Sequence, residues 1–117
     1  MNFDGVAWAN NGPDLLTRIL KRQCQTTVIK EMSAEKCNGF RVLPVSSCYE
    51  VNYNNYTMLF NETISHEVLK SLRPSIITHI WNKITESTKL LVNSNAAYIH
   101  LAKKHCPKVF ATCQEYF

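Results

Sequence analysis

Two short motifs hold the residue types best able to take part in chemistry. The first is His79-Ile80-Trp81-Asn82, which offers an imidazole, an indole N–H and an amide. A neutral imidazole can bind a metal ion, and an indole N–H can donate a hydrogen bond to a phosphate oxygen. Taken alone, a histidine beside a packed tryptophan is more often a structural pair whose polar atoms are satisfied by hydrogen bonds.

The second motif, Asn11-Gly12-Pro13-Asp14, precedes a segment with helical periodicity. A helix N-terminus presents free N–H groups and the positive end of the helix dipole, which suit an anionic or hydroxyl-rich ligand. By itself the motif is better explained as a helix cap. Familiar catalytic patterns are absent from the sequence: no serine lies in a nucleophile elbow, and the four histidines lack metal-finger spacing.

The first motif is predicted to lie at the end of a buried β-strand over residues 75–81. This segment is β-branched and apolar on both faces, as a central strand is. His79 and Trp81 would share one face, because side chains alternate along a strand. Functional loops in α/β folds follow the carboxyl ends of strands. A shorter strand is predicted over residues 40–43, ending at Pro44.

Three helices are predicted around these strands. The first begins at Pro13 with Asn11 or Gly12 as its cap, because proline is favoured at the first helical position. Its apolar face is formed by Leu15, Leu16, Ile19 and Leu20. The second helix spans residues 65–72, with Ser65 as its cap and Val68, Leu69 and Leu72 facing inward. The third helix is capped by Ser94 and ends at Cys106-Pro107. Its apolar face is formed by Ala97, Tyr98, Leu101 and Ala102. Residues 1–12 and 46–63 are predicted loops, and the pattern indicates an α/β fold with an incomplete sheet.

Composition limits the class of protein. The chain has 117 residues, 45% of them apolar and 19% charged, which is typical of one small ordered domain. No run of about 18 apolar residues occurs, so no membrane span is predicted. The formal charge is +4, and the basic residues are scattered and without a nucleic-acid-binding motif, so we expect no nucleic-acid partner.

Five cysteines and two closely spaced glycosylation sequons indicate the cellular compartment. No cysteine pair has the C-x-x-C spacing of zinc or thioredoxin-like sites. Asn55 and Asn61 each begin an Asn-x-Thr sequon in a polar stretch. Together these features predict a lumenal or extracellular glycoprotein. The alternative is a cytosolic protein with free buried thiols. In an oxidising compartment the odd cysteine count leaves one thiol free or paired outside the chain.

The two motifs, the predicted helices and strands, and the cysteines occur in a characteristic order along the chain. In that order they resemble the carboxyl-terminal part of the α-1,4-glycosyltransferase family, over nearly the whole chain. The closing residues 106–110 and 115–117 look most like the insect branch. The resemblance runs through Trp8, Asn11-Gly12-Pro13, Leu16-Thr17-Arg18, Cys24, Cys37-Asn38-Gly39, Val42-Leu43-Pro44, residues 79–83, Ala97 and Cys106-Pro107.

The resemblance implies a Golgi type II membrane enzyme of glycosphingolipid biosynthesis. It also implies a GT-A-like fold. Such enzymes transfer galactose or an N-acetylhexosamine from a UDP-sugar, in retaining α-1,4 linkage, to a glycolipid or glycan acceptor. The resemblance also implies that Mn²⁺ is a cofactor, which bridges the UDP diphosphate to an Asp-x-Asp motif. A metal ion there neutralises charge on the leaving group.

This sequence departs from the family at the metal-binding motif. Asp4 and Asp14 are its only aspartates, and they are too far apart to form Asp-x-Asp. In the family, the motif and the membrane anchor lie upstream. Residues 1–117 are therefore expected to be a carboxyl-terminal fragment, inactive alone, whose partner is the missing amino-terminal half. Two alternatives remain open: a non-catalytic lumenal binding or regulatory remnant, and an unrelated small disulfide-bonded secreted protein.

The resemblance also assigns expected roles to the two motifs. His79, Trp81 and Asn82 are placed on the donor-diphosphate side, with His79 also a candidate metal ligand. Asn11, Gly12, Pro13 and Asp14 are placed on the sugar or acceptor side. Cys24 and Cys37 are expected to pair, and Cys48, Cys106 and Cys113 have no assigned partners.

Overall fold

The computed structural model describes residues 5–7 and 9–117, so Asp4 and Trp8 lie outside the described residues. The chain divides into two compact units, residues 1–43 and residues 44–117. Among the described residues, no helix has the length and apolar character needed to cross a membrane.

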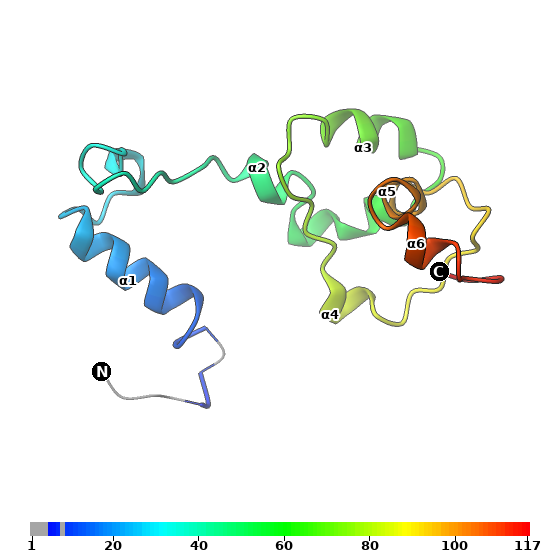
Figure 1. The fold of residues 1–117 in the computed structure, drawn as a ribbon, viewed down its shortest axis with the longest axis horizontal. Coiled ribbons are helices and arrows are strands. Elements are labelled where there is room, and N and C mark those ends of the chain that lie inside the picture. Colours follow the sequence, from blue (N-terminus) through cyan, green and yellow to red (C-terminus); the bar gives the residue numbers. More distant parts are fainter. Residues whose placement is uncertain (1–4, 8) are drawn as a thin grey trace. The chain divides into compact units, whose positions relative to one another are not determined.

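The described residues of the first unit form one α-helix and a disulfide-linked loop that contains a 3₁₀ turn. Helix α1 (Figure 1) spans Pro13–Gln23. It begins at the predicted proline, with Gly12 as its N-cap. A short 3₁₀ helix, η1, spans Ile29–Glu31. Among the described residues of this unit, Cys24, Met32 and Cys37 are buried, with Val42 packed against them. The core that these residues form is small, and all three carry sulfur.

Two expectations for the first unit change in the structure. No residue of α1 is buried, and Leu16 and Ile19 of its predicted apolar face are each about half exposed. The predicted strand over residues 40–43 is wrong, because this segment has no regular structure. It follows a turn in which Asn38 and Gly39 have positive φ and the Gly39 N–H donates to the Ala34 carbonyl. A strand needs a neighbouring strand for its hydrogen bonds, and the described residues supply none.

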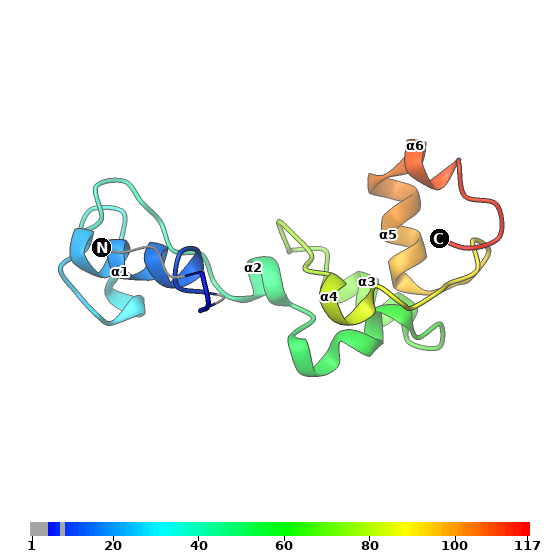
Figure 2. The same cartoon turned by 90° about the horizontal axis from the view of Figure 1, so that it is seen from below.

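The second unit is a group of short helices. They are α2 (Ser46–Tyr49), η2 (Tyr53–Phe60), α3 (Ser65–Ser71), α4 (Asn82–Thr85), α5 (Ala97–His105) and α6 (Pro107–Phe110). η2, α3 and α5 contact one another, and α6 follows directly from the end of α5 (Figure 2). Their shared core contains the buried residues Val51, Leu59, Val68, Leu72 and Ala97.

The helices over 65–72 and after Ser94 are confirmed, but their caps differ from prediction. Ile64 caps α3, while Ser65 lies buried inside it. Ala96 caps α5, and the Ser94 hydroxyl instead accepts the Ala96 N–H at 3.1 Å and donates to Glu62 at 2.6 Å. The hydroxyl therefore links the entry of α5 to the segment before α3. The end of α5 before Pro107 is confirmed.

Residues 46–63 are not the loop that was predicted. They contain α2 and η2, and Leu59 of η2 is fully buried. Asn52 begins η2 by accepting the Asn54 N–H on its side-chain oxygen at 3.0 Å. The side-chain cap and one buried leucine order a segment whose composition alone suggests a loop.

The predicted buried strand over residues 75–81 is also wrong. Ile76 and Ile77 are 69% and 61% exposed. Their N–H groups donate to one acceptor, the Ser47 carbonyl, at 2.9 and 3.1 Å, so the segment runs beside α2 and joins no ladder. Within the described ranges, pairing is limited to the bridge between Leu91 and Tyr116. The GT-A-like α/β fold stays a prediction.

Candidate functional site

His79 and Trp81 meet two tyrosines of the second unit in a group of four rings, which we call the aromatic cluster. The His79 and Trp81 ring centroids lie 4.3 Å apart. Tyr49, at the end of α2, stacks on His79 at 5.4 Å and contacts Trp81 at 5.6 Å. Tyr53, at the start of η2, meets Trp81 edge to face at 5.5 Å. Ring pairs at these distances attract one another.

Trp81 has a backbone conformation that is unusual for a bulky side chain. Its φ is 57° and its ψ 40°, in the left-handed region, which costs about 1–3 kcal/mol for such a residue. Several contacts hold it there. The indole Nε1–H donates to the Val51 carbonyl at 2.9 Å, and the Trp81 carbonyl accepts from the Ile84 N–H at 2.9 Å. The surroundings therefore over-determine the strained position, as they do at functional sites.

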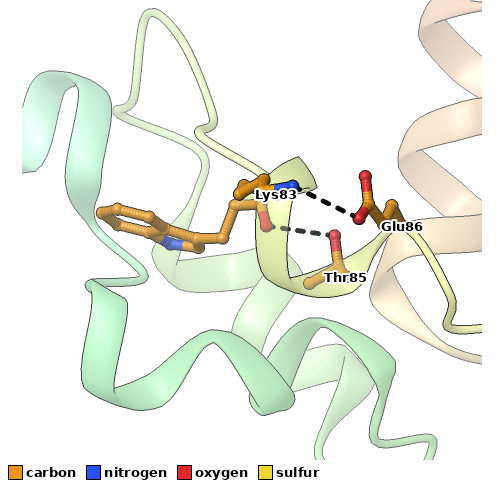
Figure 3. A network of polar contacts seen from close by, with 4 residues as sticks. Lys83, Thr85 and Glu86 are labelled. Atoms are coloured by element: carbon orange, nitrogen blue, oxygen red, sulfur yellow. Dashed lines mark hydrogen bonds and ion pairs between the residues drawn. The ribbon is translucent and has the colours of Figure 1, made fainter. Parts of the chain in front are cut away.

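Helix α4 anchors the segment that follows Trp81. The buried Thr85 hydroxyl contacts the carbonyls of Ile80 at 3.1 Å and Trp81 at 3.3 Å. Figure 3 shows the ion pair between Lys83 and Glu86, whose Nζ and Oε1 atoms lie 3.7 Å apart, with Thr85 beside it. This exposed ion pair contributes little to stability. Asn82 opens α4 and is exposed, so its amide can meet a ligand.

The tautomer of His79 follows from its hydrogen bond. The Trp81 backbone N–H donates to His79 Nδ1 at 3.0 Å. A backbone N–H can only donate, so Nδ1 accepts and the neutral ring carries its proton on Nε2. The exposed Nε2–H is then a hydrogen-bond donor, which suits a phosphate or hydroxyl oxygen. A metal ion would need a free lone pair on the ring.

The described residues do not fit a manganese site. Among residues 5–7 and 9–117, no three His, Cys, Asp or Glu side chains gather as possible ligands. Mn²⁺ favours carboxylate, carbonyl and water oxygens. His79, whose Nδ1 is occupied, has no carboxylate partner among the described contacts.

The second motif belongs to the first unit, whereas His79 and Trp81 belong to the second; its residues are Asn11, Gly12, Pro13 and Asp14. The Gly12 and Asp14 N–H groups both donate to the Ala9 carbonyl, at 3.1 and 3.0 Å. The local chain thus occupies these N–H groups at the start of α1. This geometry favours the capping explanation of the motif over an open anion site.

The predicted disulfide is confirmed, and the glycosylation asparagines are accessible. Cys24 and Cys37 are bonded, while Cys48, Cys106 and Cys113 are free thiols. Asn55 lies within η2 and Asn61 just after it, and both are exposed. The Asn61 side-chain oxygen accepts the Thr63 N–H at 2.9 Å.

Sequence reasoning missed Tyr49 and Tyr53. Both lie in the 46–63 segment that was predicted to be a loop. The available signal was the density of tyrosines in that segment, including Tyr56, but no spacing rule connects them to a His-x-Trp motif about 30 residues later.

Comparison with known proteins identifies relatives over nearly the whole chain. A family model described as "Alpha 1,4-glycosyltransferase conserved region" matches residues 1–113. Lactosylceramide 4-alpha-galactosyltransferase of Rattus norvegicus is 31% identical, over 91% of this chain and 29% of its own length. The Mus musculus protein of the same name is 29% identical, over 98% of this chain and 32% of its own length. Human alpha-1,4-N-acetylglucosaminyltransferase is 24% identical over 93% and 32%. The chain thus spans about a third of these relatives. No solved structure is significantly similar to it.

Proposed function

The chain belongs to the alpha 1,4-glycosyltransferase family, and we propose that it forms the carboxyl-terminal part of a UDP-sugar-dependent transferase. The proposed reaction transfers galactose or an N-acetylhexosamine, with retention, in α-1,4 linkage to a glycolipid or glycan. The family match over residues 1–113 carries this proposal, and the names of the relatives support the donor sugars and acceptor class.

We assign donor binding to His79, Trp81 and Asn82 of this chain. The His79 Nε2–H and the exposed Asn82 amide can each donate a hydrogen bond to a diphosphate oxygen, which supports this assignment. Fixed donors aimed at a leaving group stabilise the charge that develops on it. The Trp81 backbone N–H donates to His79 Nδ1, and the indole N–H donates to the Val51 carbonyl. Both donors are therefore occupied, so we assign Trp81 the role of positioning His79.

Activity is proposed for the complete fold only. The partner of this chain is then the remaining two thirds of a family protein, which carries the Asp-x-Asp motif and the anchor in the Golgi membrane. Mn²⁺ belongs to that complete enzyme, and no role proposed for residues of this chain depends on it. The two sequons and the disulfide fit a lumenal location.

A chimeric enzyme tests the proposal. Residues 1–113 replace the matching region of the rat lactosylceramide 4-alpha-galactosyltransferase, and product formation from lactosylceramide is measured. We expect an active chimera. His79→Ala should lower kcat about 100-fold, as loss of one preorganised donor does.

The matched control is His66→Ala, because His66 is an exposed histidine on α3 outside the aromatic cluster. It should leave the rate unchanged. A folded but inactive chimera would contradict the catalytic proposal and favour the non-catalytic binding alternative. An active chimera in which His79→Ala has no effect would refute the role of His79 alone.

A further inference from the structure

The two tyrosines of the aromatic cluster are half exposed although each contacts other rings. Tyr49 and Tyr53 are 42% and 56% exposed. Tyr49 stacks on His79 with an interplanar angle of 28°, and Tyr53 meets Trp81 at 83°. The protein therefore presents aromatic surface to solvent beside His79, and the exposed Asn82 directly follows Trp81 in the chain.

This combination matches the chemistry of a pyranose ring. One face of a sugar can be a continuous patch of C–H groups, which are attracted to the negative face of an aromatic ring. Hydroxyl groups around the rim need donors and acceptors, which phenol hydroxyls, an imidazole N–H and an amide provide. Small-ligand sites commonly combine aromatic walls with a few placed polar groups.

The stereochemistry of the sugar and the proposed reaction favour galactose over glucose as the bound ring. In galactose the 4-hydroxyl is axial, so carbons 3, 4 and 5 present their C–H bonds on the opposite face. Stacking of that face on an aromatic surface leaves O4 pointing away from the rings. In an α-1,4 transfer to galactose, O4 is the atom that receives the new sugar, so stacking on this face leaves it open to the donor.

The tyrosines are also held in place before any ligand arrives. The His79 backbone N–H donates to the Cys48 carbonyl at 3.2 Å, which ties the His79 segment to α2 next to Tyr49. The indole of Trp81 is bonded to Val51, two residues before Tyr53. A rigid site loses less conformational entropy when it binds a ligand.

We propose that Tyr49 and Tyr53 form the stacking surface for the terminal galactose of the acceptor. This inference rests on the proposed transferase function and adds two residues that determine acceptor specificity. The donor diphosphate is then bound on the His79 and Asn82 side of the same aromatic cluster.

The first test measures sugar binding by the full 117-residue chain. Methyl β-D-galactopyranoside and methyl β-D-glucopyranoside are titrated separately and followed by NMR chemical shifts. We expect tighter binding of the galactoside. Tyr53→Ala and Tyr49→Ala should each raise its Kd about threefold to tenfold, as loss of one aromatic contact does. Tyr→Phe at either position should keep most of the affinity.

Tyr116→Ala is the matched control, because Tyr116 is 48% exposed and lies outside the aromatic cluster. It should leave the Kd unchanged. The inference is overturned if the chain binds neither sugar or binds both with equal affinity. It is also overturned if Tyr116→Ala raises the Kd for the galactoside as much as Tyr49→Ala or Tyr53→Ala does. Circular dichroism checks the fold of each variant. If an alanine variant unfolds, Tyr49→Leu or Tyr53→Leu replaces it at the same position, because leucine keeps apolar bulk without the ring.

The chimera separates this inference from the proposed function. There, Tyr53→Ala should raise the KM for lactosylceramide and leave the KM for the UDP-sugar unchanged. An active chimera with an unchanged acceptor KM overturns the role of Tyr53 and leaves the transferase proposal intact. An inactive chimera combined with selective galactoside binding contradicts the transferase proposal and supports the sugar site.

Discussion

Removal of the Cys24–Cys37 disulfide should destabilise the first unit and leave the second unchanged. The bond joins residues 13 positions apart. In the chain-entropy account, closing a loop of this length stabilises the folded state by about 3 kcal/mol. The described core of the unit consists of the two half-cystines and Met32, so little apolar burial is available to compensate.

Hydrogen exchange followed by mass spectrometry can measure this effect separately for each unit. A loss of about 3 kcal/mol corresponds to exchange about 100-fold faster wherever opening of the first unit controls exchange. We therefore expect amides of α1 to lose protection in Cys24→Ser/Cys37→Ser and amides of α5 to exchange at the original rate. Reduction of the unmodified chain should give the same result without placing new hydroxyl groups in the core.

Cys106→Ser is the control, because Cys106 is a free, exposed thiol of the second unit. It should change exchange in neither unit. Unchanged protection of α1 after loss of the disulfide would refute the reasoning that the cross-link holds this unit together. Equal loss of protection in α1 and α5 would refute the independence of the two units.

Three further predictions concern residues of the second unit. Expression in a secretory host should give a glycoprotein whose mass falls on treatment with an N-glycosidase, and Asn55→Gln and Asn61→Gln should each remove one glycan, since both asparagines are exposed. Ser94→Ala should lower the free energy of unfolding in urea by about 2 kcal/mol at unchanged m-value, because it removes a hydrogen bond to the Glu62 carboxyl group. Burial raises the pKa of Tyr98, so the folded state keeps this proton at pH values where the unfolded state loses it, and stability falls as the pH rises above about 10. Tyr98→Phe should reduce that fall in alkaline urea titrations.

The sequence predicts features that depend on local chemistry. The start of α1 follows from Pro13, and the helix over 65–72 follows from its apolar spacing, with Val68 and Leu72 buried as expected. Such signals need only the backbone preferences of neighbouring residues. The cap at Ser94 failed because its hydroxyl binds Glu62, more than 30 residues away in sequence, which no local rule includes.

The predicted strand over 75–81 failed for a different reason. Its β-branched residues favour a pleated surface that is buried on both faces, but a strand forms only against another strand. Here the Ser47 carbonyl accepts both the Ile76 and the Ile77 N–H groups. Ile76, Ile77 and Ile80 instead help to line a cavity of about 770 Å³ with residues of α5, which leaves apolar surface exposed.

The proximity of His79 and Trp81 was expected, but its physical origin is different and changes the chemistry. Alternation along a strand would place both side chains on one face with their backbone groups directed to neighbouring strands. The left-handed turn at Trp81 instead directs its own N–H to His79 Nδ1. That hydrogen bond leaves the proton of the neutral ring on Nε2, so the exposed edge of the imidazole donates to a ligand. This hydrogen bond, which the sequence does not reveal, favours the proposed role of His79 as a hydrogen-bond donor over a role as a metal ligand.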